Sequence, residues 1–232
     1  MDVMLAHRAL SDPGRLALAQ GLLSRDLSGA ETADLFNWSS PLAAHHVNTL
    51  VEGGIAVRQR SEHDARRAYV SLRHDDIDVV TMVSIGLPPG NVPARVAFVC
   101  TRNSARSKLA AAWWRQLSDV PAVDAGTAPA EAPARGTLAV AERFGLDIDP
   151  VMRHVDDALE PGDLVIAVCD HVHETLPADA ARLHWSVPDP VSSPEPAAFA
   201  AASDEVRQRI GQLHQRLTRQ PRASRCTTHR ER

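Results

Sequence analysis

One cysteine in this sequence has neighbours at a spacing suited to covalent chemistry on an anion. Cys100 ends the apolar run 95–100 (RVAFVC), and Arg106 and Ser107 follow six and seven positions later, ahead of a helix-forming stretch. A strand, a short polar loop and a helix form an anion cradle, because the loop amides converge and the helix N-terminus carries partial positive charge. The pattern predicts Cys100 as a nucleophile and Arg106 as a planar fork for two oxyanion oxygens.

The residues that follow Cys100 are suited to support a reactive thiolate. An anionic substrate repels a thiolate, so the thiolate must be stabilised while it stays accessible. The loop amides, the helix N-terminus and the hydroxyl of Ser107 can do this, and Asn103 and Ser104 can brace the loop by hydrogen bonds to its backbone. The expected oxyanion-binding loop comprises Thr101, Arg102, Asn103, Ser104 and Ala105.

The scarcity of thiols limits the other chemistry that is open to this chain. The 232 residues include three cysteines, Cys100, Cys169 and Cys226, which are too few and too far apart for a disulfide framework or a paired-cysteine zinc module. His171 and His173 alternate but have no third and fourth ligand nearby, so no metal site is predicted. Cys226 lies in a basic tail, where we expect it to be incidental.

Composition indicates a globular protein with no membrane partner. Hydrophobic residues make up 44% of the chain and charged residues 23%. No window approaches the roughly 20 apolar residues of a membrane helix, and the N-terminus lacks the pattern of a signal peptide, so we expect a cytoplasmic location. The formal net charge of −4 argues against nonspecific nucleic-acid binding, although a local basic patch could still bind DNA.

Proline and glycine divide the chain into two predicted domains. Three prolines and two glycines interrupt the apolar pattern of residues 84–94 (SIGLPPGNVPA), which predicts a linker there. The domains on either side cover residues 1–83 and 95–217. Residues 218–232 are basic and polar without periodicity, which predicts a disordered tail.

The first domain has the pattern of short helices followed by a hairpin. Capping and turn residues predict helices over 11–23 and about 28–36, and a third that starts at Ser40 and continues through Leu50. Two β-rich runs around a polar tip (SEHDA) come next. Two helices joined by a short turn and followed by a hairpin are typical of an α+β winged helix-turn-helix domain.

Residues 5 to about 80 resemble the ArsR family of dimeric metalloregulatory repressors, in the segments LSDPGRLALAQGLL, TADLFNWSSPLAAHHVNTLVEGGIAVRQR and RRAYVSLR. The resemblance implies a homodimer formed through this domain, operator DNA as a partner, and a helix in the major groove that begins at Ser40. The DNA-binding residues expected on this basis are Ser40, His45 and Asn48 on the helix and Arg58, Arg60, Arg66 and Arg67 on the wing.

The first domain departs from that family at the inducer site. Arsenic and cadmium sensors of the family carry closely spaced cysteines near the helix before the turn, whereas SRDLSGAETADLF contains none. His74, Asp75 and Asp78 lie near the expected dimerisation helix, but no downstream His and Glu complete a four-ligand site. The usual thiolate sensor is therefore not supported, and the operator and inducer stay open.

Residues 95–217 resemble the low-molecular-weight protein tyrosine phosphatase superfamily, especially its arsenate reductase branch, in FVCTRNSARSKLAAAWW, VDAGTAPA, FGLDID, DLVIAVCDHV and HWSVPDP. The resemblance implies a three-layer α/β fold with a four-stranded parallel sheet flanked by helices. It also implies Cys100 as the nucleophile, Arg106 as the oxyanion binder and Asp189 as the general acid, with Ser107 beside the thiolate.

The residues after the expected acid favour arsenate over a phosphate ester as substrate. Phosphatases of the superfamily usually carry aromatic residues there that clamp a phosphotyrosine ring, but Asp189 and Pro190 lead into Val191-Ser192-Ser193. The HW-x-x-P-D-P context instead matches the arsenate reductases. A phosphatase acting on small phosphate esters or phosphoproteins is the alternative enzyme.

Reduction of arsenate takes two electrons, so a second thiol is needed. Thioredoxin-coupled reductases use two further cysteines, and here Cys169 occupies the position of the first but Leu176 that of the second. The reductant is then a low-molecular-weight thiol with a glutaredoxin-like partner, or thioredoxin, or Cys169 forms a disulfide with Cys100 directly. A buried structural Cys169 is equally open, and no tightly bound cofactor is expected.

Together these inferences predict an arsenic-responsive DNA-binding regulator fused to a thiol-dependent arsenate reductase. The fusion couples regulation and detoxification in one chain. The alternative of another class is a noncatalytic regulator whose second domain binds an oxyanion or senses thiol oxidation.

Overall fold

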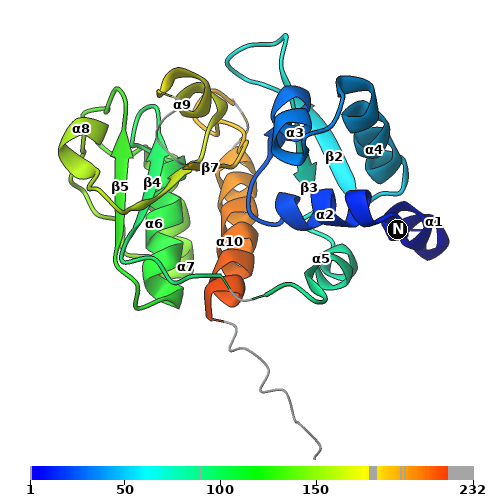
Figure 1. Ribbon diagram of the computed structural model, residues 1–232. Coiled ribbons are helices and arrows are strands. Elements are labelled where there is room, and N and C mark those ends of the chain that lie inside the picture. Colours follow the sequence, from blue (N-terminus) through cyan, green and yellow to red (C-terminus); the bar gives the residue numbers. More distant parts are fainter. Residues whose placement is uncertain (1, 89, 178–181, 194, 196, 219–232) are drawn as a thin grey trace, which may run out of the picture.

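The computed structural model describes residues 2–88, 90–177, 182–193, 195 and 197–218, which form two halves (Figure 1). The N-terminal half contains α1 (Val3–Leu10), α2 (Pro13–Leu22), β1 (Leu27–Ser28), α3 (Gly29–Phe36), α4 (Ser40–Glu52), β2 (Ala56–Arg60), β3 (Ala68–Leu72) and α5 (Ile77–Ser84). The C-terminal half contains β4 (Val96–Cys100), α6 (Arg106–Leu117), β5 (Ala122–Gly126), α7 (Arg135–Phe144), α8 (Val155–Ala158), β6 (Leu164–Ala167), α9 (Asp170–Thr175), β7 (Arg182–His184) and α10 (Ala197–Thr218). None of the described helices is long and apolar enough to cross a membrane.

Capping side chains fix where the N-terminal helices begin. Asp12 accepts a hydrogen bond from the Arg15 amide (2.9 Å) at the start of α2. α3 begins with a capping box, in which the Ser28 hydroxyl and the Glu31 carboxylate each accept from the other's backbone, and Ser39 caps α4. The three predicted helices and the predicted hairpin therefore lie within a few residues of their expected bounds, whereas α1 and β1 are not predicted from the sequence.

The N-terminal strands form an antiparallel sheet in the order β1-β3-β2. Residues 37–39 join α3 to α4, and Asn37 ends α3 in the left-handed conformation (φ 52°) that Asn tolerates better than most residues. α4 turns one face into the core and leaves the other in solvent. Side chains from α2, from α4 and from the start of the hairpin meet in this core, among them the fully buried Leu18, Leu22, Leu50 and Ile55.

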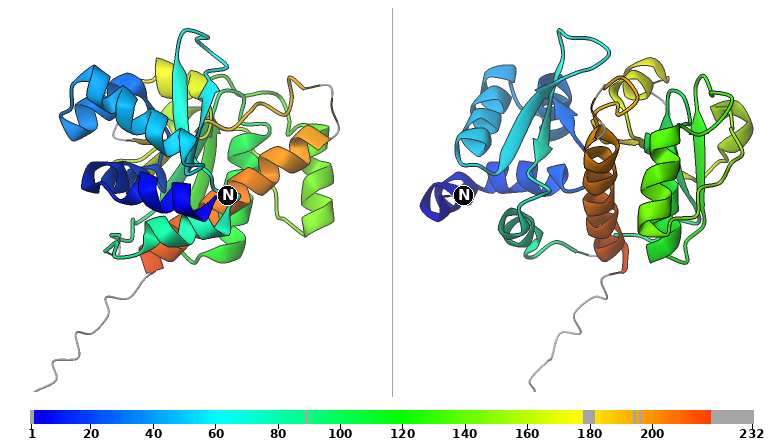
Figure 2. Two further views of the ribbon diagram at one scale, coloured as in Figure 1. Left: turned by 90° about the vertical axis from the view of Figure 1, so that its right-hand side faces the viewer. Right: turned by 180° about the vertical axis from the view of Figure 1, so that it is seen from behind.

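The C-terminal half is built on a parallel sheet in the order β5-β4-β6-β7, which confirms the predicted four-stranded parallel sheet flanked by helices. α6 and α10 lie side by side over one face of the sheet (Figure 2). Phe98 on the central strand packs between two buried tryptophans, with ring centroids 6.2 Å from Trp114 and 6.0 Å from Trp185. Because β4 is central and parallel to its neighbours, its carboxyl end brings Cys100 to the edge where such sheets bind ligands.

The predicted linker lies between α5 and β4. α5 ends at Ser84 and β4 begins at Val96, and the described residues between them, 85–88 and 90–95, contain no helix or strand. The Gly90 amide donates to the Arg216 carbonyl (2.9 Å), which ties this segment to the end of α10. The predicted tail, including Cys226, lies outside the described residues except for Thr218, the last residue of α10.

The two halves pack directly against each other, with α10 between them (Figures 1 and 2). Arg209 on α10 donates to Asp26 of the N-terminal half (3.0 Å), and both side chains are fully buried. The Asp26 amide donates to the His184 carbonyl (2.7 Å), and the Trp185 indole donates to the Ser24 carbonyl (2.9 Å). The linker therefore does not leave the halves free of each other, and N-terminal residues can contribute to a site in the C-terminal half.

Candidate active site

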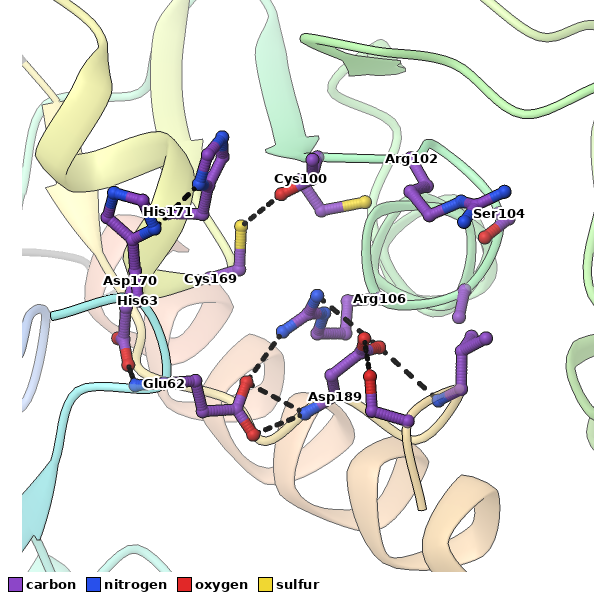
Figure 3. Close-up of a pocket in the computed structure, with 14 residues that line it drawn as sticks. Glu62, His63, Cys100, Arg102, Ser104, Arg106, Cys169, Asp170, His171 and Asp189 are labelled. Atoms are coloured by element: carbon purple, nitrogen blue, oxygen red, sulfur yellow. Dashed lines mark hydrogen bonds and ion pairs between the residues drawn. The ribbon is translucent and has the colours of Figure 1, made fainter. Parts of the chain in front are cut away.

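The loop after β4 forms a pocket of about 460 Å³ around Cys100. Cys100 is the last residue of β4 and Arg106 the first of α6, so the five residues of the predicted oxyanion-binding loop connect strand to helix as expected (Figure 3). The Sγ of Cys100 lies 3.1 Å from the Oγ of Ser107. The predicted nucleophile, oxyanion binder and supporting hydroxyl are thus brought together at one helix N-terminus, where partial positive charge favours an anion.

Buried hydrogen bonds hold the loop in this shape. Asn103 adopts a left-handed backbone conformation (φ 52°), and its side-chain amide donates to Ser107 Oγ (3.0 Å) and to Asp124 Oδ1 (2.8 Å). Its side-chain oxygen Oδ1 accepts from the Arg153 backbone amide (2.9 Å). A Cβ on Gly126 would lie 2.7 Å from the Thr101 carbonyl oxygen, so the loop can pass this close to β5 only because that residue is glycine.

A buried ion pair that the sequence patterns do not predict supports the same loop. Lys108 Nζ lies 2.6 Å from Asp124 Oδ1, and neither side chain is exposed. The same nitrogen donates to the Val151 carbonyl. Asp124 therefore links Lys108 on α6 to Asn103 in the loop, and the pair fixes the base of the cradle rather than meeting substrate.

Arg106 is buried and held by groups on two other segments, the hairpin between β2 and β3 and the loop between β7 and α10. Its Nη1 donates to the Val187 carbonyl (3.0 Å) and to Glu62 Oε2 (3.2 Å), and its Nη2 lies 3.4 Å from Asp189 Oδ1. Burial alone would lower the pKa of Arg106, but the nearby Cys169 and Cys100 and the two carboxylates raise it. The guanidinium therefore stays charged at the pocket wall.

Asp189, the predicted general acid, lines the pocket on the loop between β7 and α10. Its Oδ2 accepts from the Ser192 hydroxyl (2.8 Å), and its Oδ1 faces Arg106. The side chain is partly exposed, so it can exchange protons with solvent and still reach a group bound in the cradle.

Cys169, the predicted candidate for a second thiol, lies in the same pocket at the N-terminus of α9. Its Sγ is 3.6 Å from the Thr101 hydroxyl, and the side chain is buried. Burial, and secondly the nearby Cys100, raise the pKa of Cys169 to about 11. At neutral pH it is therefore a thiol rather than a thiolate, which makes it a slow nucleophile in this state.

The N-terminal half supplies one side of the pocket, which sequence reasoning does not predict. Glu62 and His63, at the tip of the hairpin between β2 and β3, line the pocket beside Arg106 and His171 (Figure 3). Nδ1 of His63 lies 2.9 Å from Nδ1 of His171. The available signal is the polar SEHDA tip itself, which gives no indication that Glu62 contacts Arg106, 44 positions away, or that His63 contacts His171, 108 positions away.

The residues predicted to bind DNA lie outside this pocket. The α4 residues among them are exposed, and Asn48 accepts a hydrogen bond from Arg58 on β2 (2.9 Å). On the hairpin, Arg66 and Arg67 both lie near Asp64, which reduces the positive charge of the tip. Exposed members of the set are Ser40, His45, Asn48, Arg58, Arg60, Arg66 and Arg67.

Two histidines of the C-terminal half, His171 and His173, are not part of a group of metal-ligating side chains among the described residues. Within the described part of the chain, no three His, Cys, Asp or Glu side chains are grouped so that they could hold a metal ion. His171 pairs with His63, and His173 pairs with Glu31 (2.6 Å). Both histidines therefore contact residues of the N-terminal half.

Known proteins that are similar to this chain match its C-terminal half. A family model described as "Low molecular weight phosphotyrosine protein phosphatase" matches residues 95–223. An arsenate reductase of Bacillus cereus (strain Q1) is 32% identical over 121 residues, which cover 50% of this chain and 90% of the relative. An arsenate reductase of Brevibacillus brevis is 31% identical over the same lengths.

Solved structures also align with this half. An arsenate reductase from Archaeoglobus fulgidus is 27% identical with a TM-score of 0.45, covering 51% of this chain and 97% of its own. The YwlE arginine phosphatase from Geobacillus stearothermophilus is 26% identical with a TM-score of 0.45, covering 54% of this chain and 93% of its own.

Proposed function

The chain belongs to the low molecular weight phosphotyrosine protein phosphatase family, and we propose that its C-terminal half reduces arsenate to arsenite with thiols as the electron donors. The observation that carries the proposal is the shared pocket of Cys100, Arg106 and Asp189, which among its described lining residues includes no Phe, Tyr or Trp. A cradle without an aromatic wall suits a small inorganic oxyanion better than a phosphotyrosine ring. The two curated relatives described above, at 32% and 31% identity, are named arsenate reductases.

The reaction begins with attack of the Cys100 thiolate on arsenic. The loop amides and Arg106 bind the arsenate oxygens, Asp189 protonates the departing hydroxide to water, and a bond between sulfur and arsenic(V) remains. A second thiolate then attacks the Cys100 sulfur. A disulfide forms, and the electron pair of the broken bond stays on arsenic, which leaves as arsenite. A further thiol reduces the disulfide and restores Cys100.

The electrons are proposed to come from an external thiol. The candidates are a low-molecular-weight thiol with a glutaredoxin-like partner, and thioredoxin. Cys169 is the internal candidate, because it lines the pocket near Cys100, but its raised pKa makes it a poor attacking group until the local charge changes. A Cys169→Ala variant that keeps full turnover with an external thiol would assign Cys169 a structural role.

Replacing Arg106 with alanine tests the oxyanion site. Loss of charge-assisted hydrogen bonds to arsenate should lower kcat/KM by about 100-fold, mostly through a higher KM, because such bonds contribute about 1.5–3 kcal/mol each. Initial rates over a range of arsenate concentrations measure this. The exposed Arg143→Ala on α7 is the matched control, and an unchanged saturation curve for Arg106→Ala would remove the residue from the site.

A phosphatase is the second candidate, favoured by the description of the matching family. The same cradle binds a phosphoryl group, and Asp189 would protonate an ester oxygen. The two activities separate in one comparison, because a phosphatase hydrolyses p-nitrophenyl phosphate through a phosphocysteine and needs no thiol. Rapid thiol-independent turnover of that ester without arsenite formation would favour the phosphatase.

We further propose that the N-terminal half is a winged helix-turn-helix module that binds operator DNA as a homodimer. α3, the turn 37–39 and α4 supply two helices in the expected order, and β2 and β3 supply the wing. Exposed apolar side chains on α1 and α5 support self-association, because a second copy of the chain could shield them from water. They include Val3 (54% exposed), Met4 (77%) and Ile77 (72%).

DNA binding is tested by the salt dependence of affinity for a pool of randomised duplexes. If Arg60, an exposed side chain on β2, contacts a phosphate, Arg60→Ala should weaken binding across sequences and lower the slope of log K against log salt by about one. Electrophoretic mobility shifts at several salt concentrations measure both. Arg143→Ala in the other half is the control. A wild-type chain that binds no duplex even at low salt would refute the DNA-binding module.

The alternative of a noncatalytic sensor has its own signature. Release of DNA on addition of arsenate, arsenite or phosphate, without measurable arsenate reduction, would favour it.

A further inference from the structure

We propose that Glu62, a residue of the N-terminal half, is a positioning residue of the active site that holds Arg106 and Asp189 in their working arrangement. The inference rests on the proposed function, because it assigns Glu62 to the same site. It makes catalysis dependent on a hairpin that lies outside the half matched by the family. Figure 3 shows the Glu62 carboxylate next to Arg106 and the Asp189 loop, on the pocket side of the hairpin.

The contacts of Glu62 join the two proposed functional groups. Its two carboxylate oxygens accept from the Asp189 amide at 2.9 and 3.1 Å, and Oε2 also accepts from Arg106 Nη1 at 3.2 Å. Arg106 Nη2 in turn lies 3.4 Å from Asp189 Oδ1. The hydrogen bonds of Glu62 to Arg106 and to the Asp189 amide are charge-assisted and fix direction as well as distance, and the ion pair between Arg106 and Asp189 closes the set.

The placement leaves the guanidinium able to bind substrate. A guanidinium has five donors, and Glu62 and the Val187 carbonyl share those on Nη1. The edge formed by Nε and Nη2 stays available for two oxygens of an oxyanion, which would replace the long contact to Asp189. Glu62 therefore orients the fork without taking the position of the substrate.

The hairpin tip is held in place by hydrogen bonds that do not involve the Glu62 side chain, so the position of the Glu62 backbone does not depend on that side chain. The Glu62 amide donates to Asp170 Oδ2 (2.9 Å), and the Ser61 hydroxyl donates to Glu174 Oε1 (2.6 Å). Tyr69 on β3 donates to the same Glu174 oxygen (2.9 Å). These bonds attach the hairpin to α9 on both sides of Glu62, which is how a supporting residue preorganises a site.

The Asp189 loop is the part that most needs this support. Asp189 lies outside any helix or strand, and its backbone amide donates to Glu62 rather than to a neighbouring strand. Displacement of a reacting group by about 1 Å can cost about 100-fold in rate. Loss of Glu62 should therefore slow the chemical step more than it weakens the fold, because the Glu62 side chain is 46% exposed.

The test compares Glu62→Ala and Glu62→Gln in the full chain, with Glu142→Ala on the exposed face of α7 as the control for loss of a carboxylate. Gln keeps an oxygen that can accept from Asp189 and Arg106, whereas Ala keeps none. We expect Glu62→Ala to lower kcat for arsenate reduction by about 10- to 100-fold, Glu62→Gln to stay within about threefold of wild type, and all three to keep the wild-type melting temperature.

Hydrogen exchange of the Asp189 amide gives a readout that does not need turnover. It should exchange at least about tenfold faster in Glu62→Ala than in wild type, and Glu62→Gln should restore its protection. Wild-type kcat in Glu62→Ala, or unchanged exchange at Asp189, would overturn the positioning role. If the wild-type chain reduces no arsenate and hydrolyses no aryl phosphate while exchange still responds to Glu62→Ala, the proposed function fails, whereas the positioning of Asp189 by Glu62 stands.

Discussion

The Cys100→Ser variant is expected to form no arsenite above background, a loss of roughly 10³-fold or more in turnover. A serine hydroxyl is not ionised at neutral pH, and it can form neither the bond to arsenic that undergoes reduction nor the disulfide that releases arsenite. The substitution replaces Sγ with a smaller oxygen beside Ser107, in a loop whose shape depends on Asn103 and Asp124, so the cradle should persist. Arsenite is measured directly, with the thiol supplied in excess.

Binding separates loss of chemistry from loss of the site. Titration calorimetry with inorganic phosphate should give similar affinities for wild type and Cys100→Ser, because the loop amides and Arg106 are retained. Cys226→Ser is the matched thiol control, since Cys226 is expected to take no part in the reaction. Arsenite production by Cys100→Ser at the wild-type rate would exclude Cys100 as the nucleophile.

The Arg209→Met variant is expected to lower the free energy of unfolding by about 3–5 kcal/mol, because it leaves Asp26 charged and buried without its partner. Asp26 accepts from Arg209, from the Ser71 hydroxyl and from the Ser186 amide (2.7 Å). Burial alone would raise the pKa of Asp26, but Arg209 lowers it below its ordinary value, so the carboxylate is ionised in the interface. Denaturation in urea measures the change.

Two further variants show whether the effect comes from the charge. Arg207 lies on the same helix but is half exposed and pairs with Asp204 near the surface, so Arg207→Met should change stability by less than about 0.5 kcal/mol. Adding Asp26→Asn to Arg209→Met should recover part of the loss, because the fully buried charge of Asp26 is then removed as well. Equal stability of Arg209→Met and wild type would show that α10 does not hold the halves together through this pair.

Much of the cradle could be predicted because its parts are contiguous in sequence. Cys100, the loop and Arg106 lie in one strand-loop-helix segment, and local pattern is enough to place them. Asp189 required the resemblance to a family, because residue type and spacing alone do not separate it from other loop carboxylates. α1 begins after an N-cap at Asp2 and spans only eight residues, Val3–Leu10, whereas the first predicted helix begins at residue 11.

The supports of the site could not be predicted, because they depend on long-range packing. Glu62 reaches Arg106 only because the hairpin docks on α9, and Asp26 meets Arg209 only because α10 lies between the halves. Lys108 and Asp124 form a buried pair across α6 and β5. From the sequence, each of these charged residues would be predicted to lie on the surface. Each acquires its role from a partner that is distant in the chain, which the local spacing of apolar and polar residues does not indicate.

The central claim is tested most directly by assaying arsenate reduction by the full chain in parallel with thioredoxin, glutathione and mycothiol systems. We predict that the wild-type chain forms arsenite with at least one of them, with two electrons consumed per arsenite, and that Cys100→Ser forms none. If the wild-type chain forms no arsenite with any of the three systems but hydrolyses p-nitrophenyl phosphate without thiol, the chain is not an arsenate reductase.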